Sequence, residues 1–162
     1  PRIPERVVPN RPRLLLSLML RVHANAPSKS ILGWTRQPRQ LKSLSMSVKL
    51  FVYGTLRRNE HANDLLGAEA AFLNSAETLP NYSLFQIDWY PGLVEGGHTS
   101  VKGELWSISE SEWPRLDEYE GVPEDYKREV IKLTDGSEAY AYIFIGDLGG
   151  AVQIESGDWM TR

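Results

Sequence analysis

The sequence of 162 residues is long enough for one domain with a substantial core, and it contains no cysteine. The lack of cysteine excludes a disulfide scaffold, a thiolate nucleophile and any Cys-ligated metal, and it suits a reducing compartment. Residues 1–46 carry nine Lys/Arg against one acid, whereas residues 47–162 carry nine against 20, a net charge of −11 that would repel nucleic acid.

Residues 1–46 contain six of the ten prolines and show no sustained periodicity, which predicts a disordered basic extension. Three interpretations are open: an organellar transit peptide, an arm that binds a polyanion, or upstream sequence outside the functional protein. Met46 stands two residues before the first predicted strand, which favours the third interpretation and a domain spanning residues 47–162. The apolar run at 14–20 is shorter than the roughly 20 residues a membrane span needs. We therefore expect no membrane partner and a cytoplasmic protein, organellar only if the extension is a transit peptide.

The first half of the domain alternates between strand and turn patterns. Residues 48–53 are β-branched and aromatic and predict a buried strand. Residues 61–71 are rich in Ala and Leu and predict a helix. Residues 82–87 predict a second strand, ended by the turn-rich segment 89–92, and the alternation over 101–108 predicts a third.

A hairpin is predicted near the end of the domain, because Asp135-Gly136 separates two alternating runs at 128–133 and 138–145. Asp-Gly favours a type I′ turn, in which both central residues have positive φ. About five strands with two short helices predict an α+β domain whose small sheet curls toward a barrel. Strands do not alternate with long helices, which disfavours a Rossmann-type fold.

The segment after residue 108 predicts a short helix that ends at Gly121. Ser109 and Ser111 both suit its N-cap. Pro114 favours Ser111, because Pro114 then becomes the third helical residue, where its missing N–H has no intrahelical acceptor.

At about 100° per residue, Glu120 falls inside the apolar stripe of this helix, whereas Glu118 points away from it. Burial and the negative end of the helix dipole both raise the pKa of such a carboxyl, toward a value useful for proton transfer near neutral pH. The alternative is that Glu120 belongs to a solvated acidic surface, since Asp117 and Glu124 stand nearby.

Other kinds of site find little support in the sequence. His61 and His98 are isolated, so no metal site is expected. The stretch YGTLRR at 53–58 lacks the glycines and the Gly-Lys-Ser/Thr ending of a phosphate loop. A glycine at a strand end leaves backbone N–H groups that can hold a carboxylate. Arg57 and Arg58 would face solvent or pair with acids.

These segments together resemble the γ-glutamylcyclotransferase-like family, and within it the short branch of γ-glutamylamine cyclotransferase-like proteins. The resemblance covers residues 49–159, and its motifs stand in the family's order. They are YGTL at 53–56, YPG at 90–92, VKGELW at 101–106, LDEYEG at 116–121, YKR at 126–128 and ESGDW at 155–159.

The resemblance implies a small mixed β-barrel with short flanking helices and the release of 5-oxoproline from a small-molecule γ-glutamyl substrate, without a metal or organic cofactor. The family's stretch that holds the γ-glutamyl moiety corresponds to Tyr53, Gly54, Thr55 and Leu56. Its general acid/base corresponds to Glu120, an acid that some bacterial relatives lack.

Two questions stay open at this stage. Tyr126 either lines the substrate pocket or belongs to the core of the domain. The same fold also suits a non-catalytic module that senses a γ-glutamyl or amino-acid ligand, or an enzyme that acts on glutathione or a γ-glutamylated intermediate. The leaving-amine side of the pocket is expected from the segment 88–98.

Overall fold

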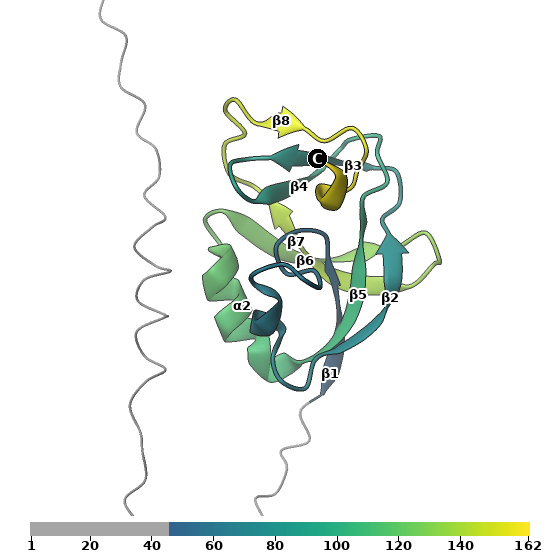
Figure 1. The fold of residues 1–162 in the computed structure, drawn as a ribbon, viewed down its shortest axis with the longest axis vertical. Coiled ribbons are helices and arrows are strands. Elements are labelled where there is room, and N and C mark those ends of the chain that lie inside the picture. Colours follow the sequence, from purple (N-terminus) through teal and green to yellow (C-terminus); the bar gives the residue numbers. More distant parts are fainter. Residues whose placement is uncertain (1–45) are drawn as a thin grey trace, which may run out of the picture. The chain divides into compact units, whose positions relative to one another are not determined.

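The computed structural model describes residues 46–162 (Figure 1). The predicted extension lies outside the described residues apart from Met46, so its disorder, its three interpretations and the domain boundary stay predictions. The elements are β1 (Ser47–Val52), η1 (Asn63–Leu66), β2 (Ala71–Glu77), β3 (Tyr82–Gln86), β4 (Pro91–Glu95), β5 (Lys102–Ser109), η2 (Glu110–Glu112), α2 (Trp113–Glu120), β6 (Tyr126–Lys132), β7 (Glu138–Phe144), β8 (Val152–Gln153) and η3 (Trp159–Thr161).

The eight strands of the described residues form two sheets, which confirms the α+β class. One sheet has five strands in the order β2-β5-β1-β7-β6, and the other has three in the order β4-β3-β8. The larger sheet is mixed, because β1 pairs antiparallel with β5 and parallel with β7. In Figure 1 the smaller sheet lies above the larger one, and α2 packs beside the larger sheet.

The expected barrel is wrong in one respect, because the strands do not close into one. The edge strands β2 and β6 approach each other just beyond their ends, where Thr78 and Leu133 form an isolated bridge and Thr134 N–H donates to the Glu77 carbonyl at 2.9 Å. Leu84 and Leu93 of the second sheet pack with side chains of the larger sheet in one core cluster.

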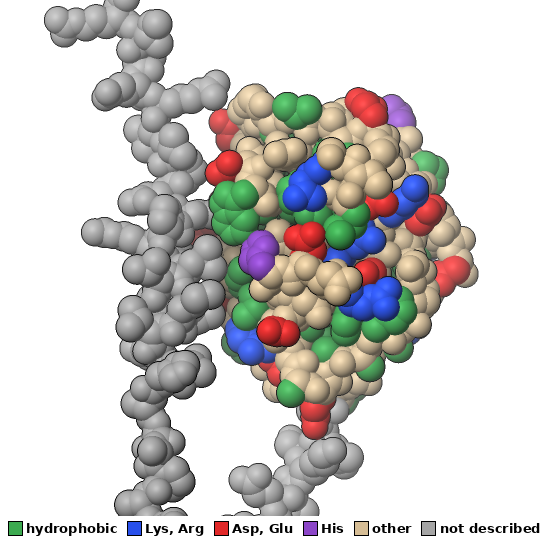
Figure 2. Space-filling model, viewed as in Figure 1, with side chains coloured by type: hydrophobic (Ala, Val, Ile, Leu, Met, Phe, Trp, Pro, Cys, Tyr) green, Lys and Arg blue, Asp and Glu red, His purple; other side chains and the backbone are tan. Residues whose placement is uncertain are grey.

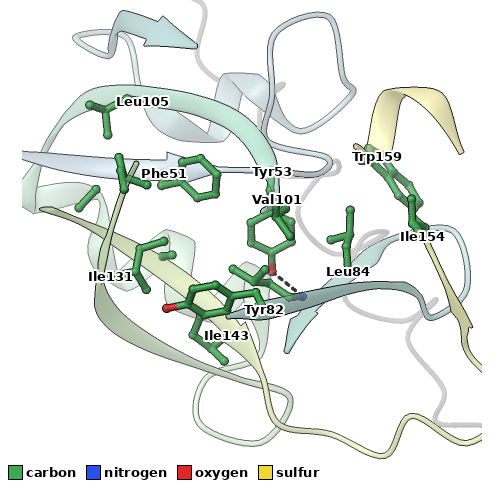
Figure 3. Packing of buried hydrophobic residues seen from close by; sticks show 14 residues of the cluster. Phe51, Tyr53, Tyr82, Leu84, Val101, Leu105, Ile131, Ile143, Ile154 and Trp159 are labelled. Carbon is green, nitrogen blue, oxygen red and sulfur yellow. Dashed lines mark hydrogen bonds between the residues drawn. The ribbon is translucent and has the colours of Figure 1, made fainter. Parts of the chain in front are cut away.

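The predicted strand at 48–53 is confirmed, and both of its faces are buried. Phe51 and Tyr53 enter one core cluster, which Figure 3 shows from close by, while Leu50 and Val52 enter a second cluster that includes Leu116 of α2. Successive side chains of a strand point to opposite faces. A strand covered on both sides therefore has an uninterrupted apolar sequence, as this one does.

The predicted helix at 61–71 is wrong. Only Asn63–Leu66 form a 3₁₀ turn, which ends at Gly67 with φ of 98°, and Ala71 already begins the edge strand β2. Pairing with β5 overrides the helical preference of this segment. The turn predicted at 89–92 is also partly wrong, because Pro91 starts β4.

The predicted hairpin is confirmed, with β6 and β7 antiparallel in full register. Its turn is not of type I′: Gly136 has φ of 82°, but Asp135 is not among the described residues with positive φ. The Gly136 N–H donates to the Leu133 carbonyl at 3.0 Å. A turn closed in this way, with glycine in the left-handed region, is another common hairpin geometry.

The helix has the predicted end but a different cap. Gly121 ends α2 in the left-handed conformation, as expected. At the other end the Ser109 hydroxyl, not that of Ser111, accepts a backbone N–H. Ser109 caps a 3₁₀ turn that moves the start of α2 to Trp113, so Pro114 still falls in the first turn, where it is tolerated.

The surface of the described domain mixes charges of both signs. Figure 2 shows acidic and basic side chains interspersed on one face instead of gathered by sign. Within residues 46–162, no helix has the length and apolar character to span a membrane.

Candidate active site

The loop that follows β1 begins at Gly54, where the chain turns sharply beneath Pro91. The Arg57 N–H donates to the Gly54 carbonyl at 2.9 Å and closes the turn. A Cβ on residue 54 would overlap the Pro91 ring and lie 2.9 Å from its Cδ, so only glycine fits this approach. The sequence therefore places glycine where the loop packs against β4.

The backbone N–H groups of Gly54, Thr55 and Leu56, which we call the amide cradle, share one property. None of them is a donor in a hydrogen bond among residues 46–162, although all three residues are buried. The carbonyls on the other side of the loop are held: Thr55 accepts from the Ala62 N–H at 3.2 Å and Leu56 from Asn63 Nδ2 at 2.7 Å. Buried N–H groups without an acceptor are costly, so the cradle is suited to bind an anion.

Tyr53, which precedes the cradle, is buried and points into the core (Figure 3). Its hydroxyl donates to the Tyr142 carbonyl at 2.7 Å and accepts from the Leu93 N–H at 3.3 Å. Burial raises the pKa of this phenol well above its usual value, and the charge of Glu120 raises it further. Tyr53 thus supports the loop from below, and Glu120 lies within electrostatic reach of its hydroxyl.

Glu120 is the last residue of α2, next to a contact between the helix and the cradle. The hydroxyl of Tyr119 lies 3.3 Å from Thr55 Oγ1. The charge of Glu120 also raises the pKa of the Tyr142 phenol, after burial and Asp117. The structure therefore brings together Tyr53, the cradle and Glu120, as the sequence analysis expected, although their roles stay predictions.

The three acids of α2 have different surroundings. Glu118 is exposed, whereas Asp117 and Glu120 are partly buried, in agreement with the positions predicted around the helix. Asp117 is held by Arg128 Nη1 at 2.9 Å and by the Tyr142 hydroxyl at 2.8 Å. The Arg128 guanidinium in turn lies 4.0 Å above the centre of the Trp113 ring. Asp117 therefore anchors α2 to β6 and β7, whereas Glu120 acts electrostatically on the phenols of both Tyr53 and Tyr142.

Of the two interpretations of Tyr126, the structure favours a place in the core. Its side chain is buried and packs edge-on against Phe144, with the ring centroids 5.2 Å apart. Its hydroxyl donates to the Pro91 carbonyl at 2.7 Å. Since Pro91 lies against Gly54, Tyr126 stabilises the cradle indirectly, through its hydrogen bond to Pro91.

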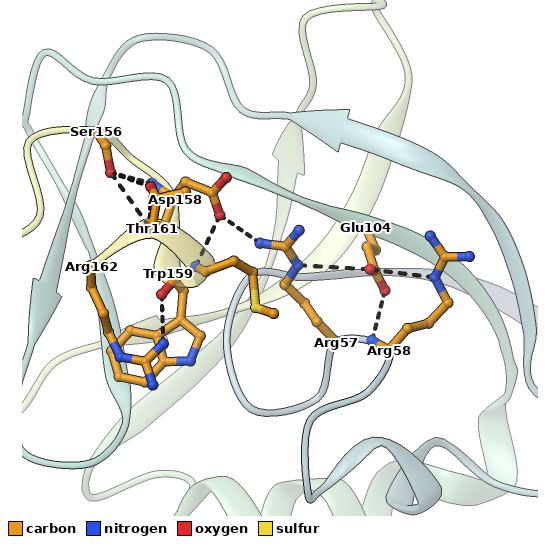
Figure 4. A network of polar contacts seen from close by, with 9 residues as sticks. Arg57, Arg58, Glu104, Ser156, Asp158, Trp159, Thr161 and Arg162 are labelled. Carbon is orange, nitrogen blue, oxygen red and sulfur yellow. Dashed lines mark hydrogen bonds and ion pairs between the residues drawn. The ribbon is translucent and has the colours of Figure 1, made fainter.

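The arginines after the cradle pair with acids, which was one of the two expectations for them. Arg57 lies between Asp158 and Glu104, and Arg58 lies on the far side of Glu104 (Figure 4). Glu104 is a buried acid that the sequence analysis missed. Alternation along β5 could have revealed it, because it shares a face with Trp106 and Ile108.

A second group missed from sequence is an aromatic cluster beside Pro91. The Trp89 ring lies 5.2 Å from the Tyr90 ring and 5.6 Å from the His61 ring, centroid to centroid. Trp89 remains 42% exposed. His61 adjoins Ala62, which is bonded to Thr55, so both chain segments place this cluster next to the cradle.

A groove of about 470 Å³ lies elsewhere, between η1 and the first half of α2. None of the sequence-predicted site residues lines it. Two of its charged side chains pair with each other, because Arg115 Nη2 donates to Glu112 Oε2 at 2.7 Å, and the same atom donates to the Leu65 carbonyl at 2.7 Å. In the described part of the chain, no group of three or more His, Asp or Glu side chains is arranged to hold a metal ion.

Comparison with known proteins identifies relatives over most of this domain. A family model described as gamma-glutamyl cyclotransferase, AIG2-like, matches residues 50–161. A Vibrio cholerae protein, named as a candidate gamma-glutamylcyclotransferase, is 41% identical over 113 residues, which cover 70% of this chain and 96% of that protein. The gamma-glutamylcyclotransferase family protein YtfP of Escherichia coli is 34% identical, with 71% and 98% covered.

Two further matches extend the comparison. Gamma-glutamylaminecyclotransferase A of Danio rerio is 29% identical over 112 residues, which cover 60% of this chain and 70% of that protein. The crystal structure of c4763, a uropathogenic E. coli-specific protein, superposes with a TM-score of 0.63 at 29% identity, over 72% of this chain and 94% of that one. The fold and the sequence therefore agree on one group of relatives.

Proposed function

Because the chain belongs to the gamma-glutamyl cyclotransferase, AIG2-like family, we propose that it is a γ-glutamylamine cyclotransferase. It converts a γ-glutamylamine into 5-oxoproline and a free amine, and residues 47–162 form its catalytic domain. The observation that supports the proposal is the contact of Tyr119, which precedes Glu120, with Thr55 of the amide cradle, together with the effect of the Glu120 charge on the pKa of the Tyr53 phenol.

The substrate supplies its own nucleophile. Its α-amine attacks the γ-carbonyl carbon, a new C–N bond closes the five-membered lactam, and the bond to the leaving nitrogen breaks. Of the three protons on the α-ammonium group, one stays on the lactam nitrogen and two pass to the leaving nitrogen. Glu120 accepts and returns these protons and ends the reaction as it began, a role worth typically 10² to 10⁴ in rate.

The amide cradle binds the α-carboxylate of the substrate. Three N–H groups on a loop held by Pro91, Ala62 and Asn63 provide fixed donors for that anion. Holding the carboxylate at the cradle while the γ-carbonyl lies near Glu120 favours the folded conformer in which the α-amine can attack. Such orientation supplies a large share of the rate enhancement in intramolecular reactions of this kind.

The leaving amine lies on the side of the aromatic cluster. Trp89 presents an exposed ring next to Pro91, and its neighbours Tyr90 and His61 hold that ring in place. A substituent on the leaving nitrogen packs against this ring. The relative from Danio rerio, named a gamma-glutamylaminecyclotransferase, supports an amine as the leaving group.

The test is turnover of a panel of γ-glutamylamines and glutathione by the full chain, read by release of 5-oxoproline. We expect turnover of at least one γ-glutamylamine, and its loss by about 10² or more in Glu120→Gln. Glu118→Gln is the matched control, because Glu118 is exposed on the same turn of the helix. Full activity in Glu120→Gln would show that the role assigned to Glu120 is wrong.

Two other outcomes would replace the proposal. If the protein turns over glutathione but none of the γ-glutamylamines, its substrate class is glutathione-like compounds and not γ-glutamylamines. Thermal stabilisation by γ-glutamyl compounds without release of 5-oxoproline would indicate a binding module.

A further inference from the structure

Glu104 is a buried acid for which the reaction above has no use. Glu104 is 5% exposed, and it is one of three buried polar or charged residues among those described. Glu104 Oε2 accepts from the Trp106 indole N–H at 3.0 Å. A buried carboxylate without partners is unfavourable, so the groups that Glu104 binds indicate what it does.

The first partner is the backbone of the loop that carries the amide cradle. The Arg58 N–H donates to Glu104 Oε2 at 3.0 Å, and Arg58 Nε lies 3.5 Å from Oε1. The Arg58 guanidinium also lies 3.6 Å above the centre of the Phe72 ring. Glu104 and Phe72 therefore hold Arg58 by its backbone and by its side chain, two residues after the cradle ends.

The second partner is Arg57, which links Glu104 to the C-terminal segment. Arg57 Nε lies 3.8 Å from Glu104 Oε1, and Arg57 Nη1 donates to Asp158 Oδ1 at 2.8 Å. Asp158 is itself fixed, because its Oδ1 accepts the Met160 N–H at 3.1 Å. Arg57 also closes the turn onto the Gly54 carbonyl. The backbone of Arg57 thus belongs to the turn that carries the cradle, while its side chain reaches Glu104 and Asp158.

We propose that Glu104 is a positioning residue for the cyclotransferase: by fixing Arg57 and Arg58, it sets the direction in which the cradle N–H groups point. This inference rests on the proposed function. Glu104 does not touch the substrate and acts through the loop. The network in Figure 4 is the physical link, and Asn63 and Ala62 hold the opposite side of the same loop.

Stability alone gives a weak reason for this arrangement. A buried ion pair whose partners are all replaced by apolar side chains of similar size is often no less stable, so the core does not by itself require this ion-pair network. An apolar residue could not accept the Arg58 N–H or fix two guanidinium groups. Orientation of the loop is what the carboxylate adds.

The test compares two substrates in Glu104→Gln: a γ-glutamylamine and its analogue in which the α-carboxylate is replaced by a carboxamide. Glutamine keeps an oxygen for the Arg58 N–H and for Trp106 but loses the charge that fixes the two arginines. Glu129→Gln is the matched control, because Glu129 pairs with Lys127 at 2.9 Å on β6, outside the segments assigned to the site.

We expect kcat/KM for the γ-glutamylamine to fall on the order of 10- to 100-fold in Glu104→Gln, chiefly through KM, since displacements of about 1 Å have such effects. The carboxamide analogue should change far less, so the preference for the carboxylate shrinks. Equal losses for both substrates would show a merely structural role. An increased preference for the carboxylate would show that Glu104 acts through its charge. Either result overturns the proposal.

Amide hydrogen exchange provides a readout that does not depend on turnover. We expect faster exchange at Arg57 and Arg58, whose backbone N–H groups are hydrogen-bonded, in Glu104→Gln than in the parent or in Glu129→Gln, with the strands unchanged. Unchanged exchange at these residues would overturn the positioning role even if the parent protein turned over none of the panel. Absence of turnover in the parent protein would instead count against the proposed function alone.

Discussion

The hydroxyl of Tyr119 and Oγ1 of Thr55 lie 3.3 Å apart, although 64 positions separate the two residues in the sequence. Tyr119 directly precedes Glu120, and Thr55 is the middle residue of the amide cradle. This contact therefore links the helix that carries Glu120, the proposed proton-transfer group, to the loop that we propose binds the substrate.

Removal of this contact should lower activity without unfolding the protein. Tyr119→Phe and Thr55→Val each delete one partner and keep both the ring and the cradle N–H. We expect each to reduce kcat several-fold and the free energy of unfolding by about 1 kcal/mol, the usual contribution of a hydrogen bond. The double variant should lose little more than either single variant. Additive losses in kcat, measured in one double-mutant cycle, would contradict a shared contact.

Gly54→Ala should displace Pro91 and the cradle together. The added Cβ overlaps the Pro91 ring, and such overpacking costs roughly 1–3 kcal/mol of the free energy of unfolding. Pro91→Ala removes the overlapping atoms, so the double variant should recover part of both stability and activity. Denaturation in urea and 5-oxoproline release measure the two effects. If Pro91→Ala gives no recovery, the close approach is not the cause.

Trp89→Ala should alter the preference among leaving amines. Loss of the exposed ring should raise KM for γ-glutamylamines with large substituents and leave γ-glutamylmethylamine nearly unchanged, since the small amine does not reach the ring. Val152→Ala is a suitable control, because Val152 is an exposed apolar residue on β8. The same KM change for large and small amines would place the leaving group elsewhere.

Tyr142→Phe should make stability less sensitive to alkaline pH. Burial, Asp117 and Glu120 raise the pKa of the Tyr142 phenol in the folded state. Above pH 10 the unfolded chain releases this proton while the folded protein keeps it, so stability falls as pH rises. Each such group contributes a slope of about 1.4 kcal/mol per pH unit. Urea denaturation from pH 9 to 11.5 should show a shallower decline in the variant.

The variant should also be less stable at pH 7, because the bond from the Tyr142 hydroxyl to Asp117 is lost. Its value is about 1.5–3 kcal/mol for a hydrogen bond to a charged group, less where water screens Asp117. If the free energy of unfolding declines equally steeply with pH in the parent and the variant, then Tyr142 titrates in the folded protein as it does in the unfolded chain.

Sequence patterns predicted an element correctly where interactions within a few residues determine its structure. The apolar run of β1 and the Asp135-Gly136 hairpin were both predicted, because strand burial and turn geometry act within a few residues. The helix expected at 61–71 failed, because pairing of Ala71 and its neighbours with β5 involves residues more than 30 positions away. Closure of the sheet failed for the same reason, since it depends on where two distant edges meet.

In the candidate site, too, features set by local spacing were predictable, whereas those that depend on long-range contacts were not. The angular position of Glu120 on α2 could be worked out from spacing alone, and the resemblance to a family supplied the cradle. Glu104 looks ordinary in an alternating strand, and only its contacts with Arg57 and Arg58 give it a role. Trp89 stood in an expected turn, and its ring contact with His61 depends on the path of the loop between β1 and η1.

The contact between Arg57 and Asp158 spans 101 positions, and this span has a consequence for folding kinetics. A contact of such long range forms only after the chain between its ends has been ordered, because the entropy of closing the loop must be offset by other contacts first. Every strand of the two sheets except β1 lies within that span. The cradle should therefore become ordered late in refolding, after the strands, and activity should return more slowly than secondary structure.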